Sequence, residues 1–144
     1  MFELFAFGAS FEPNPNLLPE RSFGWDAGIE FAVWPDRAVL DVTYFSADLT
    51  DKIGPDPENP FSVANLPGKS RREGIEVAAR VQITEALAAG AAFTFLDAKG
   101  PTGERELRRP SHSGRIDVDY RFADGKGNIT LSALYNGRMA DRGL

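Results

Sequence analysis

The first residues that could do chemistry are a histidine and its two hydroxyl neighbours. His112 is the single histidine of the chain, and Ser111 and Ser113 flank it. A serine and an imidazole can act as nucleophile and base, but a catalytic triad also needs a third partner and an oxyanion site that converge in space. Adjacency in sequence supplies neither. We therefore interpret His112 as a strand-edge residue and predict that the chain is not an enzyme.

A metal site would have to be built from carboxylates, because the sequence has no cysteine. Acidic side chains gather around "DLTDKIGPDPENP" and could offer hard oxygen ligands to calcium, but the prolines interrupt any EF-hand spacing. We interpret the segment as a solvated acidic loop and predict neither a metal nor a cofactor. The four acidic residues of this segment are Asp48, Asp51, Asp56 and Glu58.

The overall charge argues against a nucleic-acid partner. The net charge is −5 and the isoelectric point is about 4.9, whereas a nucleic-acid surface needs a basic face that displaces counterions from phosphates. The short run Lys69-Ser70-Arg71-Arg72 is interpreted as a solvated loop end.

The other charged residues alternate with apolar ones, and this alternation indicates strands. From Arg115 to Phe122 every second residue is apolar, with arginine or aspartate between, which is the period of a strand rather than of a helix. The same period recurs over residues 23–33, 38–48, 72–83 and 128–138. Together with the segment that follows, these predict about six strands of roughly 9–12 residues, longer than the usual 5–6 of soluble sheets.

The segment "TEALAAGAAFTFLDA", from Thr84 to Ala98, is ambiguous. Its alanines suit a helix, and Thr84 could be the N-cap. Gly90 in its middle and the alternation of Phe93-Thr94-Phe95 favour a strand, which is what we predict.

Two architectures fit long strands with one apolar face, namely a membrane-spanning β-barrel and a soluble or surface β-sandwich that serves as a binding module. The connections favour the barrel. Short links near residues 34–37, 84–86 and 123–127 alternate with long ones over 49–70 and 99–110, as periplasmic turns alternate with extracellular loops in outer-membrane barrels. No stretch approaches about 18 apolar residues, so no membrane-spanning helix is expected.

The aromatic and charged residues then take opposite sides of the predicted wall. The aromatic residues gather near the strand ends, as in the two interfacial girdles of a barrel. Arginine facing lipid at mid-membrane costs about 2–4 kcal/mol, so the charged positions must face the lumen. The predicted lipid-facing girdle is Trp25, Tyr44, Phe93, Phe95, Tyr120, Phe122 and Tyr135. The predicted lumen-facing wall is Asp26, Glu30, Asp41, Thr43, Glu76, Arg80, Arg115, Asp117 and Asp119.

Ordered motifs along the chain resemble those of TonB-dependent outer-membrane receptors. "NPNLLPERSFGWDAGIEF" resembles the N-P-x-L-x-P-E signature that precedes a strand in these receptors, and "GKSRREGIEVAARVQITEALAAGAAFTFLDA" resembles their following hairpin. "LRRPSHSGRIDVDYRF" and "LYNGRMAD" follow in the same order. The resemblance covers nearly the whole chain, from Phe2-Glu3-Leu4-Phe5 onward.

The resemblance implies an all-β antiparallel transmembrane barrel, of which residues 1–144 form a part. Such receptors close a 22-stranded barrel around a plug domain and import ferric siderophores or cobalamin, driven by the TonB complex. The implied location is the bacterial outer membrane, with membrane lipid, the ligand, the plug and TonB as partners. The chain lacks the TonB box, the plug and the last strands of the family pattern, so we expect a barrel fragment. The spacing in "NLPGKSRREGIEV" leans slightly toward the cobalamin branch. Ligand contacts are expected on loops 49–70 and 99–110, without individual residues assigned.

Overall fold

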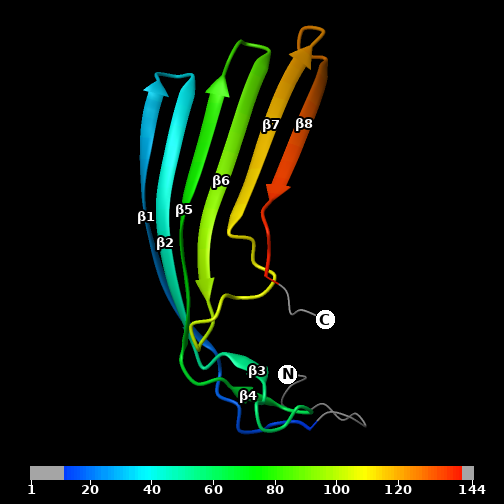
Figure 1. Ribbon diagram of the computed structural model, residues 1–144. Helices are drawn as coiled ribbons and strands as arrows, with labels where there is room; N and C mark the ends of the chain where they lie inside the picture. The colour runs from blue at the N-terminus through cyan, green and yellow to red at the C-terminus, as the bar shows by residue number, and fades with distance from the viewer. Residues whose placement is uncertain (1–11, 141–144) are drawn as a thin grey trace.

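The computed structural model describes residues 12–140, and the Phe2-Glu3-Leu4-Phe5 segment lies outside them. The predicted all-β antiparallel fold is confirmed. Six long strands form one sheet in the order β1-β2-β5-β6-β7-β8, and two short strands form a separate hairpin, β3-β4 (Figure 1). The strands are β1 (Arg21–Trp34), β2 (Ala38–Thr50), β3 (Ile53–Pro55), β4 (Val63–Asn65), β5 (Lys69–Gln82), β6 (Leu87–Lys99), β7 (His112–Phe122) and β8 (Gly127–Asn136). No helix that could cross a membrane occurs in residues 12–140.

The ambiguous alanine-rich segment is a strand, as predicted. Thr84 caps a turn rather than a helix, because its Oγ1 accepts hydrogen bonds from the backbone N–H groups of Ala86 at 3.2 Å and Leu87 at 3.0 Å. The prediction missed the β3-β4 hairpin, whose strands are three residues each. It also ended β2 and began β5 and β7 two or three residues short, since the positions of the apolar face at those ends hold polar or charged residues, namely Thr50, Lys69, Arg71 and His112.

Tight turns and long loops lie at opposite ends of the sheet (Figure 1). The β1-β2, β5-β6 and β7-β8 turns lie at one end, here called the turn end. At the other, the loop end, lie the connections over 51–68, which contains β3-β4, and 100–111. Each strand of the long sheet pairs antiparallel with the strand that follows it in the chain, and only the β3-β4 hairpin interrupts this order. The sheet therefore has the up-and-down order that the loop lengths predicted.

The strand register divides the sheet into an apolar face and a polar face. Residues that pair across antiparallel strands share a face. One row runs Ile29, Val42, Val77, Phe93, Gly114 and Tyr135, and the adjacent row runs Gly28, Thr43, Glu76, Thr94, Ser113 and Asn136. The first row belongs to the apolar face and the second to the polar face.

The described residues form a single layer with almost no core of their own. Ala98 is the one apolar residue among them that is buried, and the large apolar side chains stay open, with Leu131 67% exposed and Phe23 74% exposed. A sandwich would cover the apolar face with a second sheet. Within residues 12–140 the only second sheet is the small β3-β4 hairpin at the loop end. The described residues therefore leave the apolar face of the long sheet uncovered.

Candidate ligand site between two loops

The two loops expected to contact a ligand meet at the loop end of the sheet. Gly68, in the first loop, has φ +103, and a Cβ there would collide with the carbonyl oxygen of Pro101 in the second loop. Glycine suits both the left-handed backbone and the close approach of the two chains. The loops are therefore in direct backbone contact.

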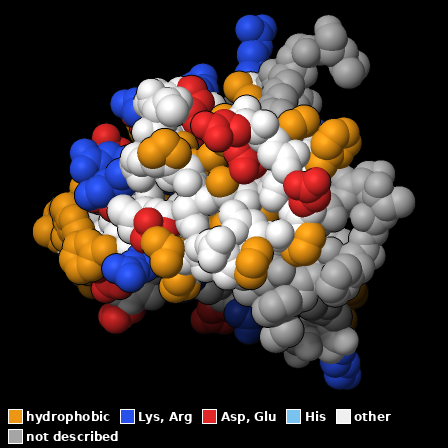
Figure 2. Space-filling view, turned by 90° about the horizontal axis from the view of Figure 1, so that it is seen from below, with side chains coloured by type: hydrophobic (Ala, Val, Ile, Leu, Met, Phe, Trp, Pro, Cys, Tyr) orange, Lys and Arg blue, Asp and Glu red, His pale blue; other side chains and the backbone are white. Residues whose placement is uncertain are grey.

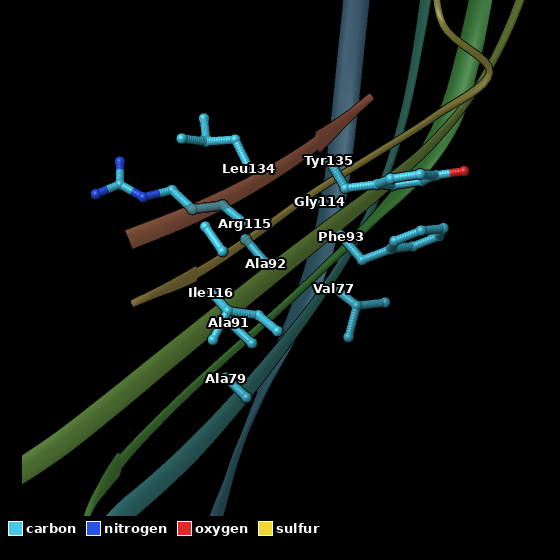
Figure 3. Close-up of a pocket in the computed structure, with 11 residues that line it drawn as sticks. Val77, Ala79, Ala91, Ala92, Phe93, Gly114, Arg115, Ile116, Leu134 and Tyr135 are labelled. Carbon is cyan, nitrogen blue, oxygen red and sulfur yellow. The ribbon is translucent and has the colours of Figure 1, made fainter. Parts of the chain in front are cut away.

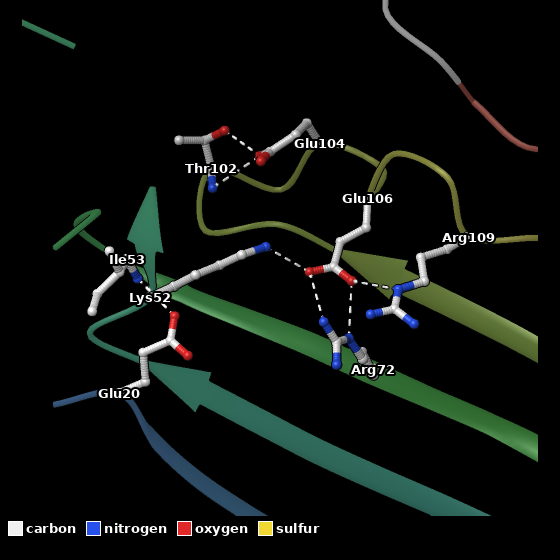
Figure 4. Close-up of polar contacts among 8 residues, drawn as sticks. All are labelled: Glu20, Lys52, Ile53, Arg72, Thr102, Glu104, Glu106 and Arg109. Atoms are coloured by element: carbon white, nitrogen blue, oxygen red, sulfur yellow. Dashed lines mark hydrogen bonds and ion pairs between the residues drawn. The ribbon is translucent and has the colours of Figure 1, made fainter. Parts of the chain in front are cut away.

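Glu106 is the centre of the polar contacts between these loops (Figure 4). Its carboxylate lies 2.7 Å from Lys52 Nζ in the first loop and 2.9 Å from Arg72 Nε on β5. Arg109 Nε, in Glu106's own loop, lies 3.8 Å away. The Glu106 side chain is only 5% exposed. A single carboxylate thus ties together both loops and the end of a strand.

The environment keeps Glu106 charged. Burial by itself raises the pKa of a carboxyl group, but the hydrogen bonds from Arg72 and Lys52 favour the charged form and outweigh it. The net effect holds the pKa of Glu106 below its usual value. Because the backbone N–H of Glu106 also donates to the Ala98 carbonyl at 2.9 Å, the residue is fixed against β6 as well.

The N-P-x-L-x-P-E segment holds the first loop from the other side. Asn65 Oδ1 accepts from the Leu18 N–H at 2.8 Å, and Asn65 Nδ2 donates to the Leu18 carbonyl at 2.9 Å. The Ile53 N–H donates to Glu20 Oε1 at 2.8 Å, and Asn14 Nδ2 donates to the Val63 carbonyl at 3.0 Å. The polar residues of the motif therefore position the β3-β4 hairpin.

A pocket of about 660 Å³ lies between the loops. Its charged lining consists of Lys52, Arg72, Arg105, Arg109, Glu104 and Glu106. Four cations face two carboxylates, so the lining carries a net positive charge. Ile53, Pro55, Leu66 and Leu107 add apolar surface. Such a pocket suits a small ligand that carries both anionic groups and apolar parts.

All nine residues predicted for the lumen wall lie on the polar face of the sheet. Arg115 Nε pairs with Asp117 at 2.7 Å, while the Ser132 hydroxyl donates to Asp117 at 2.6 Å and the Thr130 hydroxyl to Asp119 at 2.5 Å. Arg80 makes no ion pair with any residue in the described range. The wall is therefore a polar surface on which neighbouring strands are joined by side-chain hydrogen bonds.

All seven residues predicted for the aromatic girdle lie on the apolar face. Trp25 contacts Tyr44 with ring centroids 5.3 Å apart, and Tyr120 contacts Phe122 at 6.3 Å. In Figure 3 the side chains of Phe93 and Tyr135 point away from that of Arg115, on either side of the sheet. The groove drawn there, of about 420 Å³, is lined mainly by apolar side chains.

His112 begins β7, and its ring lies 5.3 Å from that of Phe95 and 6.0 Å from that of Phe93. Ser113 faces the opposite side of the sheet, and the buried Ser111 accepts a hydrogen bond from Arg105 at 2.6 Å. The structure thus gives the histidine aromatic neighbours rather than a nucleophile. Of the four acidic loop residues, Asp48 pairs with Lys69 at 3.2 Å and Arg71 at 3.0 Å. Across residues 12–140, no three potential ligands come together for a metal ion.

Sequence reasoning missed the residues that join the loops, chiefly Glu106, Arg72 and Asn65. Arg72 was assigned to a solvated loop end, and the structure corrects this, because its guanidinium binds the buried Glu106. The one available signal was the acid within the basic run "RELRRP". The main partners of Glu106, Lys52 and Arg72, lie outside that run, so the run does not identify them.

Comparisons with known proteins point to one family. The family model described as "TonB dependent receptor-like, beta-barrel" matches residues 1–143. The metal-pseudopaline receptor CntO of Pseudomonas aeruginosa, in strains UCBPP-PA14 and PAO1, is 27% identical over 129 residues. That match covers 81% of this chain and 18% of the relative.

Solved structures of the same kind share the fold. The ferric-catecholate import receptor Fiu from E. coli K12 matches with a TM-score of 0.64 at 20% identity, over 94% of this chain and 20% of that one. The FrpB iron transporter from Neisseria meningitidis matches with a TM-score of 0.62 at 16% identity, over 88% of this chain and 20% of that one. The chain therefore spans about a fifth of the length of each of these proteins.

Proposed function

Because the chain belongs to the TonB-dependent receptor-like β-barrel family, we propose that it is part of an outer-membrane receptor that imports a metal chelate. The family and the structural neighbours are transport receptors rather than enzymes. The observation that carries the proposal is the pocket between two joined loops at one end of a single-layer wall.

The described sheet is a segment of a larger barrel in this proposal. Six strands cannot close, since spanning barrels need at least about eight, and an open edge is not tolerated in lipid. The free edges of β1 and β8 would pair with strands of the remaining receptor. The match to only about a fifth of each relative supports this assignment.

The two faces of the sheet would touch different surroundings. The apolar face, with Ile29, Val42 and Val77 in one row, would contact outer-membrane lipid. The polar face would line the lumen and pack against a plug domain, and the TonB complex would supply the energy for transport. The loop end would then lie outside the cell.

The ligand in this proposal is a metal chelate rather than cobalamin. CntO is named for a metal-pseudopaline, Fiu for ferric catecholates and FrpB for iron, and the pocket has an excess of cations that suits the anionic donors of a chelate. The spacing in "NLPGKSRREGIEV" slightly favoured a cobalamin receptor. None of the relatives reported above is named for cobalamin. Binding residues concentrate on loops carried by a rigid scaffold, as here.

Uptake by cells that carry the complete receptor tests the proposal. We expect radioactive iron or nickel to enter as an anionic chelate, with entry lost in cells without TonB. Neutralising the pocket with Arg105→Gln and Arg109→Gln should reduce uptake, whereas Arg121→Gln at the turn end should not. Uptake that is independent of TonB, or cobalamin as the only transported ligand, would contradict the proposal. A 144-residue chain that is monomeric in buffer with a cooperative melt would favour the sandwich alternative.

A further inference from the structure

We propose that Asn65 is a positioning residue for the pocket between the two loops. Asn65 is not among the residues that line the pocket. It fixes the backbone just before Lys52 and so keeps the Lys52 ammonium group on Glu106, where that group adds to the positive charge that an anionic chelate meets. The inference rests on the proposed function in one respect, namely that the pocket receives an anionic chelate.

The side-chain amide of Asn65 joins two backbone segments that are far apart in the sequence. Its Oδ1 accepts from the Leu18 N–H at 2.8 Å, and its Nδ2 donates to the Leu18 carbonyl at 2.9 Å. The same Nδ2 donates to the Asp51 carbonyl at 2.6 Å. Because the amide nitrogen has two donors, both bonds can form together. Asn65 thus ties residue 51 to the proline-rich segment before β1.

The backbone of Asp51 needs such support, because it is in the left-handed region. Its φ is 57°, a conformation that is costly for residues other than glycine, although aspartate tolerates it better than most. Strained backbone of this kind persists where the surrounding structure holds it. The turn at Asp51 sets the direction in which the chain leaves β2 and enters residue 52. The bond from Asn65 therefore holds the turn that aims Lys52.

The next two backbone groups along the loop are bound as well. The Lys52 carbonyl accepts from the Leu66 N–H at 2.7 Å. The Ile53 N–H donates to Glu20 Oε1 at 2.8 Å. Together with the bond to the Asp51 carbonyl, these contacts fix three consecutive residues of the first loop. The Cα–Cβ bond of Lys52 therefore points in one direction.

The Lys52 side chain needs a fixed backbone because it is long and flexible. Holding a lysine in one rotamer costs conformational entropy, and the Lys52 side chain is still 28% exposed. Acidic and basic side chains are interspersed over the loop end, which Figure 2 views directly. Glu104 lines the same pocket, so a loose Lys52 would have more than one carboxylate to meet. The fixed backbone selects Glu106, whose Oε1 lies 2.7 Å from Lys52 Nζ (Figure 4).

The place of Lys52 decides how much positive charge the pocket keeps. An ammonium group has three N–H donors, and Lys52 directs one of them at Glu106. As far as the described residues go, the other two remain for an acceptor in the pocket. If Lys52 moved away, Glu106 would be compensated by Arg72 and Arg109 alone, and the pocket would lose one of its four cations. An anionic chelate would then bind more weakly.

The first test measures the reactivity of Lys52 and needs no ligand. The complete receptor, purified in a neutral detergent, is treated briefly with an amine-specific acetylating reagent. Acetylation of Lys52 is followed by mass spectrometry, with Lys69 as the internal reference. Asn65→Ala is compared with the control Asn59→Ala. Asn59 Nδ2 donates to Glu12 Oε2 at 2.7 Å, so the control breaks a side-chain bond between the same two segments, at the tip of the β3-β4 hairpin.

We expect Lys52 to be acetylated at least about threefold faster in Asn65→Ala than in the unaltered receptor and in the control, since one ordinary hydrogen bond corresponds to a factor of roughly 2–10 in population. Equal rates would overturn the inference. If Asn65→Ala does not assemble, Asn65→Asp takes its place, since it keeps an acceptor for the Leu18 N–H and loses both donors.

The second test separates an effect through Lys52 from a general loosening of the loops. Binding of two anionic probes, ferric citrate and a ferric tris-catecholate, is measured by tryptophan fluorescence in the unaltered receptor, Asn65→Ala, Lys52→Met and the double variant. We expect Asn65→Ala to weaken binding at least about threefold, and the double variant to bind no more weakly than Lys52→Met, because residues that act through one another are not additive.

Unchanged binding in Asn65→Ala, or a further loss in the double variant, would show that Asn65 does not act through Lys52 and would overturn the inference. A receptor that takes up no anionic chelate would defeat the proposed function instead. The acetylation rates would in that case still decide whether Asn65 positions Lys52.

Discussion

Arg72 on β5 and Glu106 in the loop after β6 form a double hydrogen bond across 34 residues of sequence. Arg72 Nε donates to Oε2 at 2.9 Å and Nη2 donates to Oε1 at 3.2 Å. The planar guanidinium matches the two carboxylate oxygens, which gives direction as well as energy. The pair thereby holds the 100–111 loop against β5.

Neutralising Glu106 should loosen both loops. Glu106→Gln keeps the shape of the side chain and removes its charge, which leaves Lys52 and Arg72 without their compensating carboxylate. We expect local opening of the loops to become easier by about 1–3 kcal/mol, below the cost of breaking a fully buried pair because the cations are partly exposed. Hydrogen exchange of the backbone amides of residues 51–68 and 100–111 in the purified receptor measures this.

Glu58→Gln is the matched control for that experiment. Glu58 lies in the first loop and is exposed, and its backbone N–H donates to Asp56 Oδ1 at 2.8 Å, a bond that the substitution leaves in place. Its exchange pattern should match that of the unaltered receptor. Identical exchange in Glu106→Gln and Glu58→Gln would show that the buried carboxylate does not join the loops.

The contact between the loops should also depend on pH, in the acidic direction. The folded structure lowers the pKa of Glu106 below its ordinary value of 4.5, so the charged carboxylate stabilises the closed loops fully above that value. Stabilisation is lost as pH falls below the ordinary range and through the lowered pKa. We expect amide exchange in loop 100–111, corrected for its intrinsic pH dependence, to stay slow at neutral pH and to accelerate below about pH 4. In Glu106→Gln this acidic transition should be absent.

Val42 and Thr43 are adjacent on β2 and face opposite sides of the sheet. Val42→Arg would place a charge in lipid, which costs about 2–4 kcal/mol near the bilayer midplane. Thr43→Arg would extend over Gly28, which has no side chain, and toward Glu76, its partner on β5. We expect the first variant to lower the amount of folded receptor in outer-membrane fractions and the second to leave it unchanged. Equal amounts of the two would mean that the faces are assigned to the wrong surroundings.

The strands of the sheet could be predicted from sequence because the alternation that marks each strand lies within a few consecutive residues. Alternation such as Ile116, Asp117, Val118 and Asp119 fixes both the strand and the face of every residue in it. The register then follows from tight turns at one end of each hairpin. For this reason the predicted wall and girdle residues separate cleanly onto the two faces of the structure.

The loop end could not be predicted, because its contacts join distant segments. Asn65 bonds the backbone of Leu18, 47 residues earlier, and Lys52 meets Glu106 across 54 residues. No periodic pattern records such pairs. The β3-β4 hairpin was also missed, since three-residue strands flanked by prolines leave no alternation to detect.

The last prediction concerns two glycines on the polar face, Gly74 on β5 and Gly90 on β6. A Cβ at Gly74 would lie 2.7 Å from Phe45 Cζ and would also collide with the carbonyl oxygen of Phe95. The Phe45 ring therefore covers Gly74 and fills the space of the missing side chain. A Cβ at Gly90 would meet only the Ala79 carbonyl oxygen, at an ordinary 3.7 Å.

We expect Gly74→Ala to lower the free energy of unfolding by about 1–3 kcal/mol, the usual cost of overpacking, whereas Gly90→Ala should be neutral. The same atoms are added in both variants, so a difference reports the local space and not a general effect of removing glycine from a strand. The midpoint of urea unfolding in lipid vesicles, followed by tryptophan fluorescence, measures both. If Gly74→Ala proves as stable as Gly90→Ala, neither the Phe45 ring nor the Phe95 carbonyl oxygen approaches Gly74 as closely as described here, because a methyl group at that position would collide with both.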